Sequence, residues 1–293
     1  MTYRALWEQG RDRLISAGTG DAATDAALLL EKVMGTSRQD LYGNGDRPVD
    51  PASAEEYLRL VGRRCAHEPT AYILGGQEFM GLFFGVDERV LIPRQDTENL
   101  VEEAMKELSS GMRILDLCTG SGCILLSLLH YSSGTTGTGT DLSPAALEVA
   151  RMNAERLGLS ERAAFSCGDL FGAPSARGQF EMIVSNPPYI RREEIDTLMP
   201  EVSAHEPRTA LDGGEDGLSF YRRIVKEAPD HLVIGGLLFV EIGYDQGAAV
   251  KALFEEEGYS GVRVIRDYGG NDRIVRGEMS LGTRKRHADI NDG

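Results

Sequence analysis

The chain has 293 residues, of which 41% are hydrophobic and 26% are charged, a globular balance that excludes wholesale disorder. Lys and Arg number 31 against 46 Asp and Glu, so the net charge is −15, which disfavours binding to a polyanion unless there is a local basic patch. No apolar run approaches the ~18 residues of a membrane span, no signal-peptide core opens the chain, and the four cysteines follow neither a disulfide nor a zinc pattern. We therefore expect a cytoplasmic protein without a metal.

The first 68 residues are predicted to fold as a bundle of short helices. Apolar residues recur three or four positions apart in three segments, which is the spacing of a buried helix face. These residues are Tyr3, Leu6, Trp7, Gly10 and Leu14, then Ala26, Leu29, Leu30 and Val33, and then Tyr57, Leu60, Val61 and Cys65. A small bundle of this kind more often binds a partner than catalyses a reaction. We therefore predict a substrate-docking domain over residues 1–68.

Residues 69–91 are predicted to link this bundle to the rest of the chain through a β-hairpin. The hydrophobic period shifts towards two, with strands expected at Gln77–Met80 and Leu82–Val86 on either side of Gly81. The tripeptide Gly75-Gly76-Gln77 precedes the first strand. It could be read as a glutamine-bearing substrate loop, but glycine pairs before a strand are ordinary turn chemistry, and we interpret it as a turn.

From residue 92 to residue 280 the chain alternates between strand-like and helix-like segments, the pattern of an α/β domain. Ser143–Leu157 is a predicted helix with Ser143 as its N-cap, and Leu218–Ala228 is another. Strands are expected at residues 112–118, 136–140, 163–167, 180–185, 236–242, 262–267 and 273–278. Seven such strands indicate a mainly parallel sheet with helices on both faces. The polar tail, residues 281–293, is predicted to be flexible.

Two further segments of this domain have a distinctive composition. Pro93-Arg94-Gln95-Asp96-Thr97-Glu98 opens the helix before the first strand, and Asp96 or Thr97 is a candidate N-cap. Capping accounts for the acidic residues of this segment but not for Pro93-Arg94. The second segment, residues 190–217, is a long insert that contains Glu206-Pro207 and is suited to act as a lid over a site.

The first motif with chemical content lies where the strand at residues 112–118 meets a helix. Cys118-Thr119-Gly120-Ser121-Gly122 forms a glycine-containing turn before a helix that begins near Cys123. Such a turn lets the backbone approach a ligand, and the free N–H groups of the helix start face its polar atoms. Asp141 stands 21 residues after Gly120, at the end of the next strand, where its carboxylate can accept both hydroxyls of an adenosine ribose.

The spacing of the glycines restricts the class of cofactor. A dinucleotide fold uses G-x-G-x-x-G, but Leu125 occupies the third glycine position counted from Gly120, and Cys123 occupies it counted from Cys118. The pattern therefore favours a nucleoside cofactor without phosphates, and S-adenosyl-L-methionine fits that description. The alternative interpretation is a tight turn beside an unrelated aspartate.

The motif Asn186-Pro187-Pro188-Tyr189 follows the strand predicted at residues 180–185 and is the most informative stretch of the chain. The prolines have no backbone N–H, so the strand cannot continue, and they hold the residues before them in extended geometry. The side-chain oxygen of Asn186 and the main-chain oxygen of Pro187 can accept both hydrogens of a planar NH2 group. Tyr189 offers a flat face for the conjugated system that carries this group. The alternative interpretation is a simple turn.

Such a pair of acceptors suits methyl transfer to a weakly nucleophilic nitrogen. The lone pair of an amide or aromatic NH2 is delocalised, and attack on a sulfonium methyl places positive charge on the nitrogen. Fixed acceptors on both hydrogens stabilise that charge and aim the lone pair at the methyl carbon. No strong general base is required, because the alkylated product readily loses a proton.

Taken together, these segments closely resemble the HemK/PrmC family, which methylates glutamine N5 in peptide chain release factors. The resemblance covers nearly the whole chain, including the helical domain, the hairpin, residues 93–98, the glycine turn, Asp141, residues 186–189 and Glu206-Pro207. It implies a Rossmann-like, seven-stranded S-adenosylmethionine-dependent methyltransferase domain over residues 92–280. The implied reaction methylates the glutamine of the Gly-Gly-Gln motif of release factors and modulates translation termination.

The resemblance also implies a role for individual residues. Asn186, Pro187 and Tyr189 are implied to be catalytic, and together with Pro188 they hold the substrate glutamine. The residues implied to bind S-adenosylmethionine are Cys118, Thr119, Gly120, Ser121, Gly122, Asp141, Asp169, Leu170 and Asn186. Two of them depart from the family pattern. Cys118 stands where the motif often begins with glycine, and Leu170 stands where some members have tryptophan.

Two other functions compete with this one. An adenine or guanine amino-methyltransferase acting on DNA or RNA is the nearest, because the same pocket accepts any planar NH2 group. The net charge of −15 and the lack of a basic recognition domain count against it. The other is a ligand-sensing module or scaffold, which would not need Asn186 or Asp141. We expect a monomer that binds release factors and neither nucleic acid nor a membrane.

Overall fold

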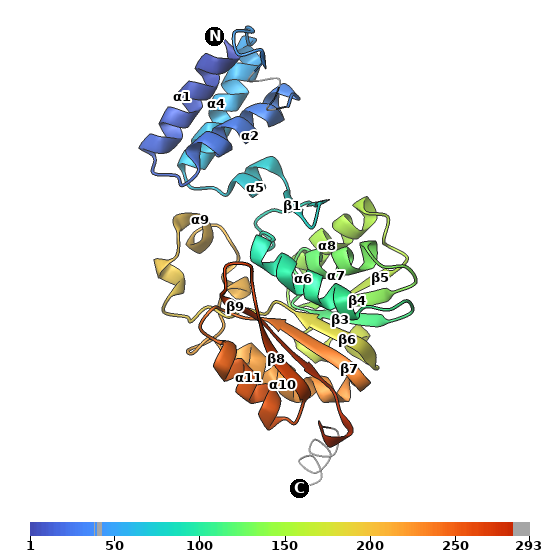
Figure 1. The fold of residues 1–293 in the computed structure, drawn as a ribbon. Coiled ribbons are helices and arrows are strands. Elements are labelled where there is room, and N and C mark those ends of the chain that lie inside the picture. The colour runs from blue at the N-terminus through green and yellow to red at the C-terminus, as the bar shows by residue number, and fades with distance from the viewer. Residues whose placement is uncertain (38, 40–42, 284–293) are drawn as a thin grey trace. The chain divides into compact units, whose positions relative to one another are not determined.

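The computed structural model describes residues 1–37, 39 and 43–283 (Figure 1). The chain divides into two compact units. The helical unit consists of Met1–Gln77 and Met199–His205, and the sheet unit consists of Glu78–Leu198 and the described chain from Glu206 onward. The first change between the units falls after Gln77, inside the linker predicted over residues 69–91.

The helical unit contains the three helices that the apolar spacing predicts, α1 (Tyr3–Ser16), α2 (Ala22–Met34) and α4 (Pro51–Cys65). The described chain of this unit also has two short helices that were not predicted, α5 (Thr70–Leu74) and α9 (Pro200–Ser203). The hydroxyl of Thr2 accepts a hydrogen bond from the backbone N–H of Ala5 at 3.3 Å and so caps α1. Asp50 caps α4 in the same way, accepting from Ser53 at 2.9 Å. α2 ends at Gly35, whose φ of +60° favours glycine.

The apolar helix faces meet in one core. Its buried residues include Leu6, Leu14, Ala26, Leu29, Leu30, Tyr57, Leu60 and Val61. Gly10 belongs to this packing because a Cβ there would lie 1.9 Å from the hydroxyl of Tyr57. That hydroxyl donates to the carbonyl of Ala26 at 3.3 Å. Burial of each large side chain contributes roughly 2 kcal/mol, so this face holds the bundle together.

The segment predicted as a linker is partly helical. Thr70–Leu74 forms α5, which ends at Gly75 with a φ of +79°. The predicted hairpin is confirmed as β1 (Gln77–Phe79) and β2 (Leu82–Phe84). Gly75-Gly76-Gln77 therefore ends a helix and begins a strand, in agreement with its interpretation as a turn.

The sheet unit is built on a seven-stranded sheet, which confirms the predicted α/β fold (Figure 1). The strands are β3 (Arg113–Leu117), β4 (Thr136–Asp141), β5 (Ala163–Cys167), β6 (Phe180–Ser185), β7 (Leu232–Glu241), β8 (Ser260–Arg266) and β9 (Asp272–Glu278). Their order across the sheet is β5-β4-β3-β6-β7-β9-β8. β3 to β7 are parallel, and β9 runs antiparallel to both of its neighbours.

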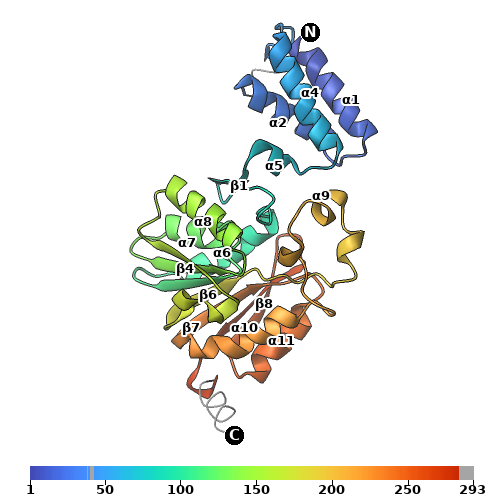
Figure 2. The ribbon, with the colours of Figure 1, turned by 180° about the vertical axis from the view of Figure 1, so that it is seen from behind.

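Helices cover both faces of the sheet, as the alternation of elements predicts (Figures 1 and 2). One face carries α6 (Gln95–Glu107), α7 (Cys123–His130) and α8 (Pro144–Arg156), and the other carries α10 (Ser219–Glu227) and α11 (Gly247–Glu256). Successive strand residues point to opposite faces. Ile114 and Met182 therefore join the core under the first set, whereas Leu115 and Ile183 join the core under the second.

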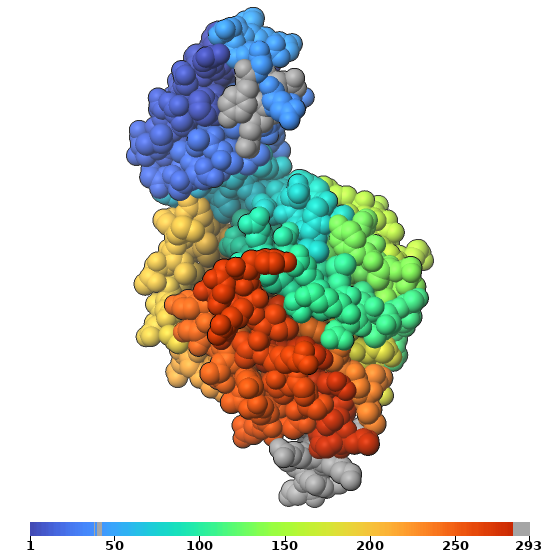
Figure 3. Space-filling view, in the orientation of Figure 1, coloured from blue at the N-terminus to red at the C-terminus, as the bar shows by residue number. Residues whose placement is uncertain are grey.

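The turn between β8 and β9 lies against α6 on the surface of the sheet unit (Figure 3). The hydroxyl of Tyr268 in this turn donates to Oε2 of Glu102 at 2.9 Å. Arg273, at the start of β9, forms an ion pair with Asp96 in the first turn of α6 at 3.0 Å. The antiparallel strand thereby holds the N-terminal end of α6.

The carboxyl ends of β3, β4, β6 and β7 meet at one edge of the sheet, because these strands run parallel. Ligands of open α/β sheets bind outside this edge. The glycine turn follows β3, Asp141 ends β4, and Asn186 follows β6. The topology therefore brings together three motifs that are far apart in the sequence.

The described end of the chain packs against the sheet unit. Thr283 is buried, and its hydroxyl donates to the carbonyl of Gly258 at 2.7 Å. Within the predicted tail, this hydrogen bond anchors Thr283, and the flexibility of the tail stays a prediction. Residues 284–293 of the predicted tail lie outside the described residues. Across the described chain, we find no helix with the length and apolar character needed to cross a membrane.

Candidate active site

A cavity of about 470 Å³ opens at the carboxyl edge of the strands, within the sheet unit. The predicted site residues that line it are Cys118, Gly120, Asp141, Asp169, Leu170, Asn186 and Pro188. The other predicted residues, which are not part of the lining, are Thr119, Ser121, Gly122, Pro187 and Tyr189. The insert that follows β6 also contributes Pro207, Thr209 and Ala210 to the lining of the cavity.

The glycine turn needs its glycines for two different reasons. Gly120 and Gly122 have φ angles of +53° and +79°, in the left-handed region that favours glycine. Gly120 also brings its backbone to the cavity. A Cβ at Gly122 would lie 3.1 Å from Leu126 and 3.3 Å from Ala150, so this glycine allows α7 and α8 to pack closely.

Thr119 and Ser121 are buried beneath the turn. The Thr119 hydroxyl donates to Oδ2 of Asp116 at 2.6 Å, inside the sheet. Burial raises the pKa of Asp116 to about 7. These side chains therefore support the turn, and Cys118 and Gly120 are the motif residues that reach the cavity.

Asp141 is held at the cavity by two backbone hydrogen bonds. Its Oδ2 accepts from the N–H of Gly120 at 2.9 Å, and its Oδ1 accepts from the N–H of Ser143 at 2.9 Å. Burial raises the pKa of this carboxyl, and the backbone donors oppose that rise. Each oxygen keeps a second lone pair, so the carboxylate can also accept two hydroxyl groups of a diol.

Residues Asn186–Tyr189, which we call the NPPY loop, leave the sheet directly after β6. The hydroxyl of Ser185 donates to the carbonyl of Leu117 at 2.8 Å and fixes the end of the strand. The side-chain Nδ2 of Asn186 donates to Oγ1 of Thr97 at 3.2 Å. In this bond the NH2 group of Asn186 points towards α6. The side-chain oxygen Oδ1 therefore points away from α6 and can accept a hydrogen bond.

The backbone of the NPPY loop is clamped by the segments around it. Nε2 of Gln246 donates to the carbonyl of Tyr189 at 3.0 Å and to that of Gly217 at 3.3 Å. A Cβ at Gly213 would lie 2.7 Å from Cα of Tyr189, so the insert packs on the loop only with glycine at this position. These contacts hold the loop rigidly at the sheet edge.

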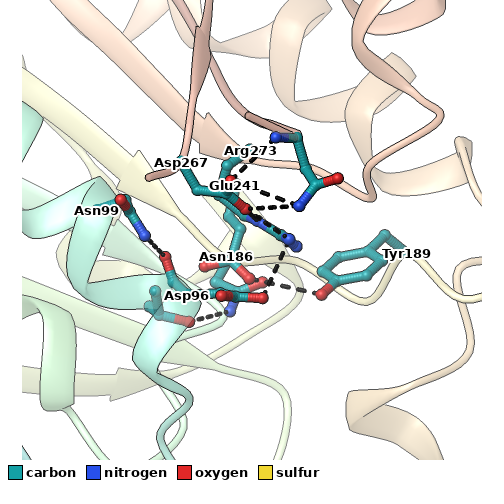
Figure 4. Close-up of polar contacts among 9 residues, drawn as sticks. Asp96, Asn99, Asn186, Tyr189, Glu241, Asp267 and Arg273 are labelled. Atoms are coloured by element: carbon teal, nitrogen blue, oxygen red, sulfur yellow. Dashed lines mark hydrogen bonds and ion pairs between the residues drawn. The ribbon is translucent and has the colours of Figure 1, made fainter. Parts of the chain in front are cut away.

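A cluster of charged side chains lies next to the NPPY loop, as Figure 4 shows. It consists of Asp96, Glu241, Asp267 and Arg273. The hydroxyl of Tyr189 lies 3.5 Å from Oε1 of Glu241, which is buried at the end of β7. Arg273 forms ion pairs with Asp96 and Asp267, both at 3.0 Å. Burial raises the pKa of Glu241 to about 7. Burial also raises the pKa of Tyr189, so its hydroxyl stays protonated and donates to Glu241.

Helix α6 begins earlier than its sequence predicts. Its first residue is Gln95 and Arg94 precedes it, so Asp96 and Thr97 lie within the first turn and neither is the N-cap. Nη2 of Arg94 bonds to Oε1 of the buried Glu206 at 2.5 Å. Helix capping did not account for Pro93-Arg94. This ion pair explains why that segment and Glu206 of the insert occur together.

Comparison with known proteins assigns the family. Residues 5–75 match the family described as the PrmC N-terminal domain, and residues 114–205 match the methyltransferase domain family. A release factor glutamine methyltransferase of Geobacter sulfurreducens is 42% identical over 278 residues, which cover 95% of this chain and 97% of that protein. One of Agrobacterium fabrum is 44% identical over 271 residues, covering 90% and 93%. The chain belongs to the release factor glutamine methyltransferase family.

The fold agrees with this membership. A crystal structure of a methyltransferase from Pyrococcus furiosus matches with a TM-score of 0.53 at 20% identity, covering 69% of this chain and 91% of that one. The likeness confirms the predicted Rossmann-like methyltransferase fold. A member of the release factor glutamine methyltransferase family uses S-adenosylmethionine as methyl donor, as the sequence predicts.

The cavity suits a nucleoside donor that carries no phosphate. Asp141 lines it with a carboxylate that keeps free lone pairs, and Leu170 gives it an apolar wall. The two arginines of its lining are already paired with carboxylates. Arg89 pairs with Asp87 at 2.6 Å, and Arg223 pairs with Asp169 at 2.9 Å.

Cys118 and Leu170, the two residues that depart from the family pattern, have left-handed backbone conformations. Cys118 has a φ of +59° and Leu170 has a φ of +49°, which is uncommon for residues with a Cβ. Burial raises the pKa of the Cys118 thiol, so it stays neutral beside the cavity. The family motif often has glycine at position 118, and the positive φ of this position explains that preference.

Several polar residues around the NPPY loop were absent from the sequence predictions. Glu241, Gln246 and Arg273 are among them. Glu241 gives a weak signal, because it is an acid that ends a buried apolar strand of the sheet. Gln246 and Arg273 give none, since their partners come from distant segments. Thr97 was considered only as a helix cap, whereas its side chain is buried against Asn186.

Proposed function

We propose that this protein transfers the methyl group of S-adenosylmethionine to the N5 amide of the glutamine in the Gly-Gly-Gln motif of peptide chain release factors. The reaction modulates translation termination. Membership in the release factor glutamine methyltransferase family supports this substrate. The single structural observation that carries the proposal is the hydrogen bond from Asn186 to Thr97, which leaves the side-chain oxygen of Asn186 free to accept from a substrate amide.

The NPPY loop supplies two acceptors for the glutamine amide. One is Oδ1 of Asn186, and the other is the main-chain carbonyl of Pro187. Among the described residues, no group donates to the Pro187 carbonyl, so this oxygen is available. The ring of Tyr189, fixed through its hydroxyl by Glu241, provides a flat surface against the carboxamide.

These acceptors stabilise the charge that develops during the reaction. Bound S-adenosylmethionine supplies an electrophilic methyl group on a sulfonium. The glutamine nitrogen becomes positively charged as its bond to the methyl carbon forms and the carbon–sulfur bond breaks, which leaves a neutral thioether, and Asn186 and Pro187 hold both hydrogens of the nitrogen. Their fixed positions also direct the nitrogen lone pair towards the methyl carbon. The N-methylated cation is strongly acidic and loses a proton to solvent, so the chain needs no general base.

The cofactor assignment within the cavity belongs to the same proposal. Asp141 binds the ribose hydroxyls, Gly120 and Cys118 approach the donor through the backbone, and Leu170 contacts the adenine. Thr119, Ser121 and Gly122 act indirectly by shaping the turn. Asp169 contributes at the rim, where it pairs with Arg223.

The helical unit is proposed to dock the body of the release factor. We further propose that the protein acts as a cytoplasmic monomer and does not bind nucleic acid. The net charge of −15 supports the last point, because it opposes binding to a polyanion.

A transfer assay tests the proposal. The purified protein is incubated with methyl-labelled S-adenosylmethionine and one of four substrates: a release factor, the same factor with its Gly-Gly-Gln glutamine changed to alanine, DNA, or ribosomal RNA. We expect label only on the unmodified release factor, and a mass increase of one methyl group on the Gly-Gly-Gln peptide. Label confined to DNA or RNA, or equal label on the alanine variant of the factor, would contradict the proposal.

A further inference from the structure

The ion pair between Arg94 and Glu206 joins two segments that line the cavity. Nη2 of Arg94 lies 2.5 Å from Oε1 of Glu206, and both residues belong to the sheet unit. The first segment, residues 89–91, lies just before Arg94, and each of its residues lines the cavity. The second segment follows Glu206 directly and lines the cavity with Pro207, Thr209 and Ala210. One contact thus connects two walls of the same cavity, although its partners are 112 residues apart in the sequence.

The two partners of this contact differ in exposure. The side chain of Glu206 is 1% exposed, whereas that of Arg94 is 39% exposed. Burial raises the pKa of the Glu206 carboxyl group, and the Arg94 guanidinium opposes that rise. A guanidinium can only donate hydrogen bonds, so Oε1 of Glu206 accepts from it in either protonation state of the carboxyl group. The buried carboxyl group therefore depends on a partner that reaches it from the surface.

A proline connects each charged residue to the segment that it would hold. Pro93 lies between residues 89–91 and Arg94, and Pro207 follows Glu206 directly. Proline fixes its own φ and keeps the residue before it extended, and Pro207 has a φ of −60°. Pro93 is buried as well. These short, stiff stretches of backbone carry the position of the ion pair to the residues that line the cavity.

The segment after Glu206 is also held at its other end, by backbone hydrogen bonds. The N–H of Ile190 donates to the carbonyl of Leu211 at 3.0 Å, and the N–H of Gly213 donates to the carbonyl of Ile190 at 2.8 Å. Ile190 is the residue that follows the NPPY loop. The lining residues between 207 and 210 thus lie between two attachments. The attachment through Arg94 and Glu206 is made by side chains, so a substitution can remove it.

We propose that Arg94 and Glu206 are positioning residues for S-adenosylmethionine, because their contact fixes two walls of the cavity relative to each other. This inference rests on the part of the proposed function that places the cofactor in this cavity. A buried ion pair can often be replaced by apolar side chains without loss of stability. Stability alone therefore gives little reason for a buried carboxyl group here, whereas a defined geometry of the cavity does.

Arg94→Met removes the guanidinium but keeps most of the length of the side chain. We expect the Kd for S-adenosylhomocysteine, measured by calorimetry on the full chain, to rise roughly tenfold. The kcat at saturating S-adenosylmethionine should stay within about threefold, because other contacts hold the NPPY loop. Arg94→Lys keeps a cation beside Glu206 and is expected to recover most of the lost affinity.

Arg208→Met is the matched control. Arg208 stands between the lining residues Pro207 and Thr209, but its side chain is exposed and pairs with the exposed Asp196 at 2.7 Å. An exposed pair of this kind contributes little, so the variant should keep the Kd of the wild type. A wild-type Kd for Arg94→Met, or an equal rise in Kd for Arg208→Met, would overturn the proposal.

The double variant Arg94→Met with Glu206→Met separates positioning from stability. It leaves no unpaired carboxyl group buried at this position, so its Tm should return towards that of the wild type. The Kd for S-adenosylhomocysteine should nevertheless remain raised, because the polar contact between the two walls is missing. If the Kd recovers together with the Tm, the pair serves stability alone and the proposal is wrong.

Asp141→Ala, measured in the same way, distinguishes failure of this inference from failure of the proposed function. A raised Kd for Asp141→Ala together with a wild-type Kd for Arg94→Met rejects the positioning role and keeps the cofactor in the cavity. A wild-type Kd for both variants rejects the placement of the cofactor and the inference with it. No release factor is present in these measurements, so they do not depend on the identity of the substrate.

Discussion

At the scale of single residues, the account depends on one carboxamide oxygen. Asn186→Ala removes this acceptor, and we expect kcat for release factor methylation to fall at least roughly 100-fold, the loss typical for one oxyanion-type partner. The affinity for S-adenosylmethionine, measured by calorimetry, should change less than about threefold, because the ribose is held elsewhere.

Asn99→Ala provides the control for that variant. Asn99 lies on α6 close to the same cluster, but its half-buried side chain donates to the backbone carbonyl of Asp96 at 2.8 Å (Figure 4). Its replacement should leave kcat unchanged. An active Asn186→Ala enzyme would remove the basis for the acceptor role of this residue.

Cys118 carries backbone strain at the start of the glycine turn. Its φ of +59° is disfavoured for any residue with a Cβ, at a cost of about 1 kcal/mol. Cys118→Ala and Cys118→Gly both remove the thiol, but only glycine also relieves the strain. We expect the Gly variant to be about 1 kcal/mol more stable than the Ala variant in urea unfolding. An Ala variant at least as stable as the Gly variant would show that the turn is not strained here.

Glu241 makes stability depend on pH. Burial raises its pKa to about 7 in the folded protein, against 4.5 when it is exposed. Between these values the folded state holds a proton that the unfolded state lacks, so this group makes the protein less stable as the pH rises from about 4.5 to 7.

Glu241→Gln removes this titration while keeping the shape of the side chain. We expect the free energy of unfolding of the variant, relative to wild type, to increase by about 3 kcal/mol at most between pH 5 and pH 8. Parallel stability curves for the two proteins would contradict the raised pKa.

At the scale of elements, most of the fold was predictable because its signals are local. Ser143 caps α8 by accepting from the N–H of Ala146 at 3.2 Å, as its sequence predicts. The seven strands follow from short apolar runs between turn residues. The start of α6 was not predictable, since Arg94 is held by Glu206 from a distant insert rather than by a local cap.

The helical unit contains a polar network that joins four helices. Nε of Arg64 on α4 lies 2.7 Å from Oδ2 of Asp25 on α2, and its Nη1 lies 2.9 Å from Oε1 of Glu201 on α9. The hydroxyl of Thr70 donates to the second oxygen of Asp25 at 2.7 Å. The network explains why residues 199–205 group with the helices, although they come from the insert after β6.

Arg64→Ala is expected to destabilise the helical unit by about 3 kcal/mol, because it leaves buried carboxylates without their cation. Arg63→Ala on the same helix is the matched control. Arg63 pairs with Glu68 at the partly exposed surface, where the loss should be less than about 1 kcal/mol. Thermal unfolding of both variants measures the difference. Equal losses would show that the buried network does not stabilise this unit.

At the scale of the whole molecule, the sequence predicts the local motifs of the candidate site but not the contacts between them. The glycine turn, Asp141 and the NPPY loop could be singled out because each is a compact motif, and the fold brings residues of all three to one cavity. Glu241 and Gln246 were missed because their roles arise only when the sheet brings β7 and the following loop next to the NPPY loop. The addition of residues 199–205 to the helical unit could not be predicted either, since it depends on contacts of Glu201 with Arg64 and His67 and of His205 with the Ala66 carbonyl, which are distant in the sequence.

The most direct measurement is a crystal structure of the protein with S-adenosylhomocysteine and a peptide containing Gly-Gly-Gln. The account predicts that the glutamine side-chain nitrogen lies within hydrogen-bond distance of both Oδ1 of Asn186 and the carbonyl oxygen of Pro187, with Asp141 on the ribose. A complex in which either oxygen is turned away from the glutamine nitrogen, or in which the nucleoside occupies a different cavity, would contradict it.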